Sequence, residues 1–382
     1  MDPTLHKLGE LFCGPGGIAA GARKASAERN SRESSIEHVW ATDYHHDTCE
    51  TYRDNFFPTQ PERVIEHDIR TLDMKRLGAI SEIDALAFGF PCNDFSVVGE
   101  QKGTDGDYGP LYSYGVRALK LFRPKWFLAE NVSGLTSSNE GSAFVSILED
   151  LRKCGYDLFP HLYKFEDYGV PQARHRIIII GIREDLQLQF KIPSPSGLLV
   201  SSREALTNIP DWASNQELTK QASQVVERLN LIKPGHNAFT ADLPPHLRLN
   251  VRGAKISQIY KRLDPSKPSY TVTGSGGGGT HMYHWSEPRA LTNRERARLQ
   301  TFPDDFVFRG GKESVRRQIG MAVPVDGVAH IFRAILDTFD GRDYPHTAPV
   351  FSPLFYDDQD ETIRASQTKI LEETQFVSRE VQ

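Results

Sequence analysis

Four side chains in the first half of the chain could together modify an electron-poor ring. Cys92 lies on a turn after one apolar run, Glu130 ends a second, and Arg174 and Arg176 precede a third. If these runs are strands of one sheet, the four side chains meet where the strands end. A thiolate can add to a ring, and carboxyl and guanidinium groups can stabilise the charge that forms. This pattern suggests covalent catalysis.

A glycine-rich turn near the N-terminus could hold a nucleotide-like cofactor. The turn follows a strand-like run and contains Phe12, Gly14, Gly16 and Gly17. Without side chains, it lets a ligand approach the backbone and the start of the next helix. Asp43 ends the next expected strand, where a carboxylate can accept hydrogen bonds from ribose hydroxyls, and Asp68 ends a further one. These positions indicate an adenosyl-type pocket, although a tight turn alone would also explain the glycines.

The elements that must position these residues follow a regular alternation. Strand-like apolar runs lie at 7–12, 38–42, 83–88, 126–129 and 177–182, and helical patterns lie at 16–28, 46–56, 112–122 and 142–154. The runs 83–88 and 177–182 are nearly continuous, as in strands buried on both faces. The alternation predicts an α/β fold with a mostly parallel sheet and helices on both faces. It stops after residue 183, where Pro193-Ser-Pro195-Ser-Gly197 predicts a domain boundary.

Composition excludes several protein classes. The chain has 382 residues, 38% hydrophobic and 25% charged, which is typical of a globular protein. No apolar run is long enough for a bilayer and the N-terminus lacks a signal core, so we expect a cytoplasmic protein with no membrane partner. The four cysteines form neither a disulfide framework nor a metal pair, and no His/Cys cluster predicts a metal site.

Charge is distributed unevenly along the chain. The formal net charge of −5 argues weakly against a nucleic-acid partner. Residues 243–263, however, contain only basic charges, namely Arg248, Arg252, Lys255, Lys261 and Arg262. Such a stretch can follow a phosphate backbone, and a solvated surface is an equally good interpretation.

In their order, these motifs resemble those of the cytosine-5 DNA methyltransferases of restriction–modification systems. The match is colinear from about Gly9 to Pro324. It rests on Phe-x-Gly-x-Gly-Gly at 12–17, Gly-Phe-Pro-Cys-x-x-Phe-Ser at 89–96, Glu-Asn-Val at 130–132 and Gln-x-Arg-x-Arg at 172–176, and the segments 289–303 and 318–324 also fit. Glu10, Asn93 and Met321 depart from the usual Asp, Gln and Asn, and Met321 weakens the last motif.

The resemblance implies a Rossmann-like S-adenosylmethionine-dependent methyltransferase sheet and a smaller, mixed target-recognition domain. We expect a catalytic and cofactor domain at 1–190, a recognition domain at 191–312, a helical segment returning to the first domain at 313–342, and an extension of unassigned role at 343–382. The implied activity is sequence-specific DNA (cytosine-5)-methyltransferase. The alternatives are an RNA cytosine-5 methyltransferase and a catalytically idle nucleic-acid-binding protein of the same fold.

The resemblance also implies roles for individual residues. Cys92 would add to C6 of a flipped cytosine, with Glu130 near N3, Arg174 near O2 and Arg176 beside them, and S-adenosyl-L-methionine would become S-adenosyl-L-homocysteine. Cofactor contacts are expected from Phe12, Gly14, Gly16, Gly17, Asp43, Tyr44, Asp68, Ile69, Pro91, Leu111 and Val323. DNA contacts are expected from Ser96, Gln172, Arg252, Lys255, Thr271 and Thr273. The expected partner of this monomer is double-stranded DNA, and a cognate restriction endonuclease would act on the same site without direct contact.

Overall fold

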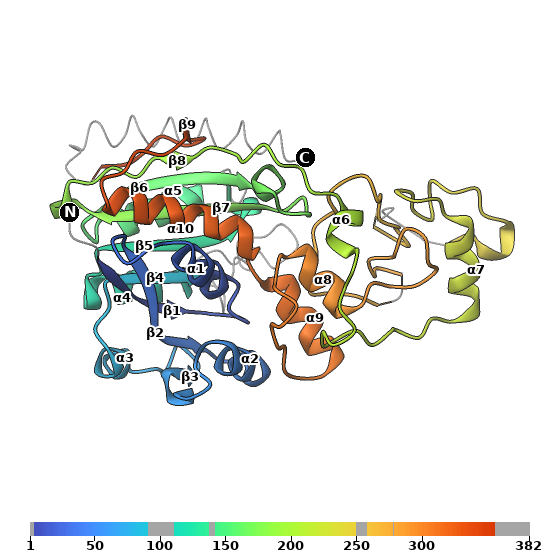
Figure 1. The fold of residues 1–382 in the computed structure, drawn as a ribbon, viewed down its shortest axis with the longest axis horizontal. Helices are drawn as coiled ribbons and strands as arrows, with labels where there is room; N and C mark the ends of the chain where they lie inside the picture. The colour runs from blue at the N-terminus through green and yellow to red at the C-terminus, as the bar shows by residue number, and fades with distance from the viewer. Residues whose placement is uncertain (1–3, 91–110, 137–141, 250–257, 278, 356–382) are drawn as a thin grey trace.

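The computed structural model describes residues 4–90, 111–136, 142–249, 258–277 and 279–355. It has two lobes, a larger one built on a sheet and a smaller one with few regular elements (Figure 1). The sheet has the order β3-β2-β1-β4-β5-β7-β6. Its strands are β1 (Leu5–Leu11), β2 (Ser35–Asp43), β3 (Val64–Glu66), β4 (Ala85–Gly89), β5 (Trp126–Val132), β6 (Tyr156–Lys164) and β7 (His175–Arg183).

Helices cover both faces of this sheet. Apolar residues of α3, α4 and α5 pack with the sheet in one core, and those of α1 and α10 pack in another. The helix α2 packs beside β2. The bounds are α1 (Gly17–Ala27), α2 (His46–Phe56), α3 (Lys75–Ile80), α4 (Leu111–Phe122), α5 (Ser142–Arg152) and α10 (Val325–Phe339). The predicted α/β architecture is therefore confirmed.

One strand runs against the others. β1 to β5 pair in parallel, whereas β7 pairs antiparallel with both β5 and β6. The first residues of β7 therefore lie beside the last residues of β5, with Val132 opposite Arg176. The reversal brings Arg176, the end of the arginine motif, to the carboxyl end of β5.

The smaller lobe has its own two apolar cores. One joins α6 and α8 to α9, and the other lies around α7, Tyr260 and Tyr283. Its helices are α6 (Ser202–Leu206), α7 (Ser223–Leu231), α8 (Asn293–Leu299) and α9 (Lys312–Met321). Long irregular connections link these helices (Figure 1).

The predicted helical segment 313–342 is two helices that serve different lobes. α9 belongs to the core of the smaller lobe and α10 packs on the sheet. The non-helical residues Ala322–Pro324 separate the two helices. The return to the first lobe therefore begins at Pro324, which starts a new helix because proline suits a helix N-terminus. By length and composition alone, 312–339 could cross a membrane, but its most apolar window is 78% buried inside the protein. It is core.

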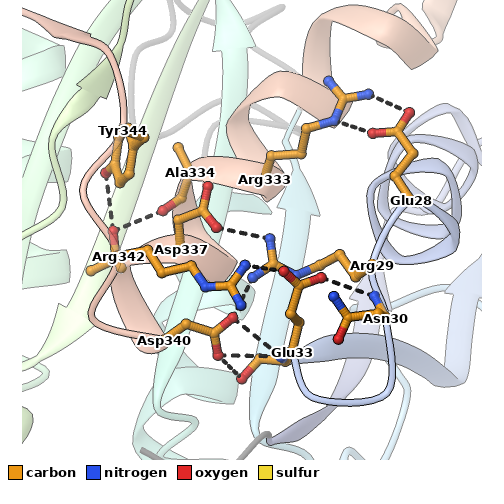
Figure 2. A network of polar contacts seen from close by, with 12 residues as sticks. Glu28, Arg29, Asn30, Glu33, Arg333, Ala334, Asp337, Asp340, Arg342 and Tyr344 are labelled. Carbon is orange, nitrogen blue, oxygen red and sulfur yellow. Dashed lines mark hydrogen bonds and ion pairs between the residues drawn. The ribbon is translucent and has the colours of Figure 1, made fainter.

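An ion-pair network holds α10 to the turn between α1 and β2 (Figure 2). Arg29 lies between Asp337, 2.9 Å away, and Asp340. Asp340 also accepts hydrogen bonds from the backbone and hydroxyl of Ser34. Arg333 pairs with Glu28 at the outer side of the network. These contacts join residues about 300 positions apart and fix the last helix against the first.

The first part of the predicted C-terminal extension belongs to the sheet lobe. β8 (Ile192–Pro193) pairs with β9 (His346–Thr347), and Leu354 exchanges backbone hydrogen bonds with Leu158 of β6. Phe351 packs edge-on against Phe144 in the core. Because β6 is the last strand of the sheet, this segment covers part of an otherwise open edge.

Candidate functional site

The glycine-rich turn connects β1 to α1 with a strained backbone. Phe12, Gly14 and Gly16 all have positive φ, at 53°, 55° and 95°. A Cβ on Gly14 would meet nothing within 4 Å, so its side faces open space. A Cβ on Gly17 would lie 2.4 Å from the carbonyl oxygen of Val323, so the start of α1 tolerates no side chain there. The turn thus leaves backbone open for a ligand and brings Val323 beside it.

Asp43 holds this turn from the end of β2. Its two carboxylate oxygens accept hydrogen bonds from the backbone N–H groups of Gly14 and His45, each at 3.0 Å. Burial raises the pKa of Asp43, and these backbone donors oppose the rise. The carboxylate therefore positions the glycine turn, and its remaining lone pairs are available to a ribose.

The other expected cofactor residues lie along the same edge of the sheet, but they differ in exposure and in the partners they already have. Tyr44 is 72% exposed next to Asp43, as a platform for a ring would be. Asp68 is occupied by Arg70, which contacts both of its carboxylate oxygens. The side chains of Ile69 and Leu111 are buried in the core, so only their backbone could reach a ligand.

A buried polar cluster lies beneath the turn. Glu10 of β1 is fully enclosed and accepts a 2.8 Å hydrogen bond from the hydroxyl of Tyr52. Burial raises the pKa of Glu10 to about 8. His38 lies 3.9 Å from it, and burial lowers the pKa of His38 to about 3. Near neutral pH the cluster therefore carries a protonated carboxyl and a neutral imidazole.

Glu130 and Arg176 form an ion pair at the carboxyl end of β5. The Nε of Arg176 lies 2.8 Å from Oε1 of Glu130, and both side chains are mostly buried. Burial raises the pKa of Glu130, and the positive charges of Arg176 and Arg174 oppose the rise. Gly89 pairs with Glu130 in the sheet, and its position would place a Cβ 3.1 Å from Oε2. The segment that leads to Cys92 therefore starts beside this carboxyl group.

Arg174 has a different environment from the one expected. It is 1% exposed, and its guanidinium donates to the backbone carbonyls of Val272 at 3.0 Å and Gly320 at 2.9 Å. These bonds join β7 to the smaller lobe and to the end of α9. The structure favours Arg176 over Arg174 for a contact with a ring held at Glu130, because Arg176 is the arginine paired with that carboxyl group.

The structure corrects the expected role of Gln172. We expected this side chain to contact DNA, but it is 0% exposed. Its amide donates to Leu299 and Gln300 and accepts from the backbone N–H of Val272 at 2.7 Å. Because both the nitrogen and the oxygen of the amide are already bonded within the protein, Gln172 joins the two lobes instead.

The two threonines also differ. Thr271 donates its hydroxyl to the carbonyl of Ala173 at 2.7 Å, so this hydroxyl is already engaged. Thr273 is exposed, and its hydroxyl accepts a hydrogen bond from the hydroxyl of Ser275. Thr273 is therefore the better placed of the two for a DNA contact.

Several expected site residues lie outside the described part of the chain. These are Pro91, Cys92, Ser96, Arg252 and Lys255. The neighbouring Phe90 is held by Asn131, whose amide donates to its carbonyl at 3.0 Å. Within the described ranges, no group of His, Cys, Asp or Glu could hold a metal ion.

Sequence reasoning missed two buried residues of this region. Gln300 accepts from Gln172 and donates to the carbonyls of Ile319 and Ala322, so it ties α8 to the end of α9. Arg296 lies fully buried in α8. The only sequence signal was the density of arginines at 294–298, which does not distinguish a bonded arginine from an unbonded one.

Comparison with known proteins agrees with this geometry. The family model of C-5 cytosine-specific DNA methylases matches residues 6–337. The Type II methyltransferase M.BbvI of Brevibacillus brevis is 57% identical over 89% of this chain and 93% of its own length. M.NgoFVII of Neisseria gonorrhoeae is 41% identical, over 87% of each chain. The solved structure of a putative DNA modification methyltransferase from an E. coli prophage shares the fold, with a TM-score of 0.69 at 23% identity over 88% of this chain and 99% of that one.

Proposed function

Because this chain belongs to the C-5 cytosine-specific DNA methylases, we propose that it methylates C5 of one cytosine in a specific double-stranded DNA sequence, using S-adenosylmethionine. The observation that carries the proposal is the Glu130–Arg176 pair beside Gly89, at the strand end that leads to Cys92. A carboxyl group and a guanidinium there suit a polar ring edge.

The residues of the glycine turn fit S-adenosylmethionine, which supplies an electrophilic methyl group. The open side of Gly14 leaves room for a ligand against the backbone, and Asp43 and exposed Tyr44 lie next to it. Carboxylate, aromatic ring and bare backbone are the groups that bind ribose, adenine and a charged tail. Phe12, Gly16 and Gly17 shape this turn, and Val323 closes it from the connection between α9 and α10.

Cys92 acts as the nucleophile. Its thiolate adds to C6 of the cytosine, which makes C5 electron-rich enough to form a bond to the methyl group. Loss of the C5 proton then breaks the C6–S bond, so the thiolate leaves and the ring becomes aromatic again. Because C6 is inaccessible in stacked DNA, the base must leave the duplex, which costs a few kcal/mol.

Glu130 and Arg176 stabilise the ring during this addition. Negative charge moves toward N3 and O2 when the thiolate adds. Burial raises the pKa of Glu130, which helps this carboxyl group to hold a proton toward N3. Arg176, at 2.8 Å from the same carboxyl group, offers donors toward O2. Arg174 acts through position, since its two terminal nitrogens donate to the carbonyls of Val272 and Gly320.

The proposed substrate is DNA, and the alternative of an RNA cytosine-5 methyltransferase is rejected. The family model and the curated relatives are DNA methylases, while the likeness to a DNMT2 structure from Spodoptera frugiperda, at 16% identity and a TM-score of 0.61, concerns the fold alone. We further propose a cytoplasmic monomer that shares its DNA site with a cognate restriction endonuclease, without contact between the two.

The test is direct. The full chain is incubated with labelled S-adenosylmethionine and unmethylated plasmid DNA or transfer RNA, and 5-methylcytosine is mapped by bisulfite sequencing. We expect methylation of one cytosine in one short DNA sequence. Label in RNA only, or no label with DNA, contradicts the proposal.

A further inference from the structure

Arg296 is a buried arginine whose donors are unused. It lies in α8 and is 1% exposed, and none of its three guanidinium nitrogens has a hydrogen-bond partner among the residues that the structure describes. Two positions earlier in the same helix, Arg294 is equally buried but donates to Ser214, Pro303 and Phe306. Unpaired charged groups are rarely left in a protein interior, because burying them is costly. Arg296 therefore calls for an explanation that Arg294 does not.

The surroundings of Arg296 are positive. Arg316 of α9 lowers the pKa of Arg296 electrostatically, second to burial, and both arginines lower the pKa of nearby His281. The Nε of Arg316 is also buried and unpaired. Gly276 lies against Arg316 and His281, since a Cβ on it would lie 3.1 Å from Nε of Arg316 and 3.0 Å from Nδ1 of His281.

The carboxylates close to this group, among the described residues, do not neutralise it. Glu295 is held by Arg289 through two 2.8 Å contacts. Glu313 lies 3.4 Å from Arg316, but its side chain is 87% exposed. Arg296 and Arg316 therefore both have buried donors without a hydrogen-bond partner among the described residues, and both act electrostatically on His281. That is the chemistry of an anion site.

We propose that Arg296 and Arg316 bind a phosphodiester of the DNA backbone, which approaches from the side where Gly276 lies. The proposal rests on the proposed function, because DNA is the polyanion that this family binds. A guanidinium matches a phosphate bidentately, and Gly276 presents only backbone to an approaching strand. Thr273, Ser275 and Gly277 of the same segment are exposed, so its outer side is open to DNA.

The experiment compares three variants of the full chain, R296M, R296K and R294M. Fluorescence anisotropy measures binding to a duplex with the mapped site and to a duplex without it, between about 0.05 and 0.2 M salt. We expect R296M to bind both duplexes about tenfold more weakly, with a salt slope smaller by about one. R296K should keep the slope. The melting temperature of R296M should stay equal or rise, whereas that of R294M should fall, because only Arg294 has bonds to lose.

Other outcomes overturn the proposal. Unchanged affinity with a lowered melting temperature would make Arg296 a structural residue, and weaker binding to only one duplex would mean that it reads a base. If sulfate raises the melting temperature of the wild type but R296M binds DNA normally, the site takes a free anion instead. If R296M does not fold, R316M on the neighbouring helix provides the same test. Methyl transfer is measured separately, so a failure of the proposed function is visible in the wild type alone.

Discussion

Replacing Cys92 by serine removes the thiolate that adds to the ring, so we expect methyl transfer to be lost with little change in melting temperature. An alkoxide is not available at neutral pH, and serine differs from cysteine by one atom of similar size. A duplex with 5-fluorocytosine at the mapped site should trap the wild type as a covalent adduct on a denaturing gel, since fluorine blocks the final elimination. Normal turnover by C92S would contradict the mechanism.

Substitutions of the two arginines in the Gln-x-Arg-x-Arg motif should affect different properties, one mainly the rate and the other mainly the stability. Arg176→Gln removes the charge beside Glu130 but keeps an amide donor there, so it should lower kcat by about 10² to 10³ and destabilise the fold less than loss of Arg174 does. Arg174→Met leaves the carbonyls of Val272 and Gly320 unpaired and should destabilise the fold by about 2 kcal/mol. Single-turnover kinetics and denaturant titration of both variants measure the two effects. Equal loss of stability in both would remove the distinction.

At the scale of elements, the network between α10 and the turn after α1 should dominate the docking of the last helix. Arg29→Met leaves Asp340 buried without its partner and should cost about 3 kcal/mol of unfolding free energy. Lys24→Met breaks an exposed pair with Asp326 between the same helices and should cost under about 1 kcal/mol. Urea unfolding of the two variants provides the comparison. A similar small loss in both would mean that apolar packing alone holds α10.

The sequence predicted individual elements better than their pairing. The four helices expected in the first half are all present, and their ends agree within two residues, with 46–56 identical to α2. They were predictable because the apolar spacing of a helix is local information. The direction of β7 was not predictable, since a strand buried on both faces has the same apolar run whether it pairs in parallel or antiparallel. The segment 313–342 is helical, but its division at Pro324 was not predictable, because it depends on which lobe each half packs against.

The site was predictable where a motif fixes backbone geometry, and less so where partners are distant. Gly14 and Asp43 were singled out from local patterns, and the structure joins them by a hydrogen bond. Gln172 and Arg174 were not separable from surface residues, because their partners Val272 and Gly320 lie about 100 to 150 positions away. Polar residues in motifs are conspicuous in a sequence whether they meet a ligand or a neighbouring lobe.

At the scale of the whole molecule, buried titratable groups should set the pH of greatest stability. Burial lowers the pKa of His6 and His161 to about 4 and of His38 to about 3, so stability falls as pH drops below about 6.5 and the unfolded chain binds protons. Burial raises the pKa of Glu10 from 4.5 to about 8, so stability falls as pH rises through that interval. Melting temperatures should therefore peak near pH 6 to 7. Glu10→Gln should flatten the alkaline side, and an unchanged alkaline slope would contradict this assignment.

The pairing of Leu354 with Leu158 has a practical consequence for anyone who shortens this protein. A chain ended at Arg342, just beyond residue 337 where the family match stops, would lose Phe351 from the core and uncover backbone donors and acceptors on β6. Uncovered edge strands can pair between molecules. The shortened chain should therefore form oligomers or inclusion bodies in which β6 of one molecule pairs with β6 of the next. A chain ended at Phe355 should stay monodisperse in size-exclusion chromatography. If the two behave alike, the cover over β6 is dispensable for solubility.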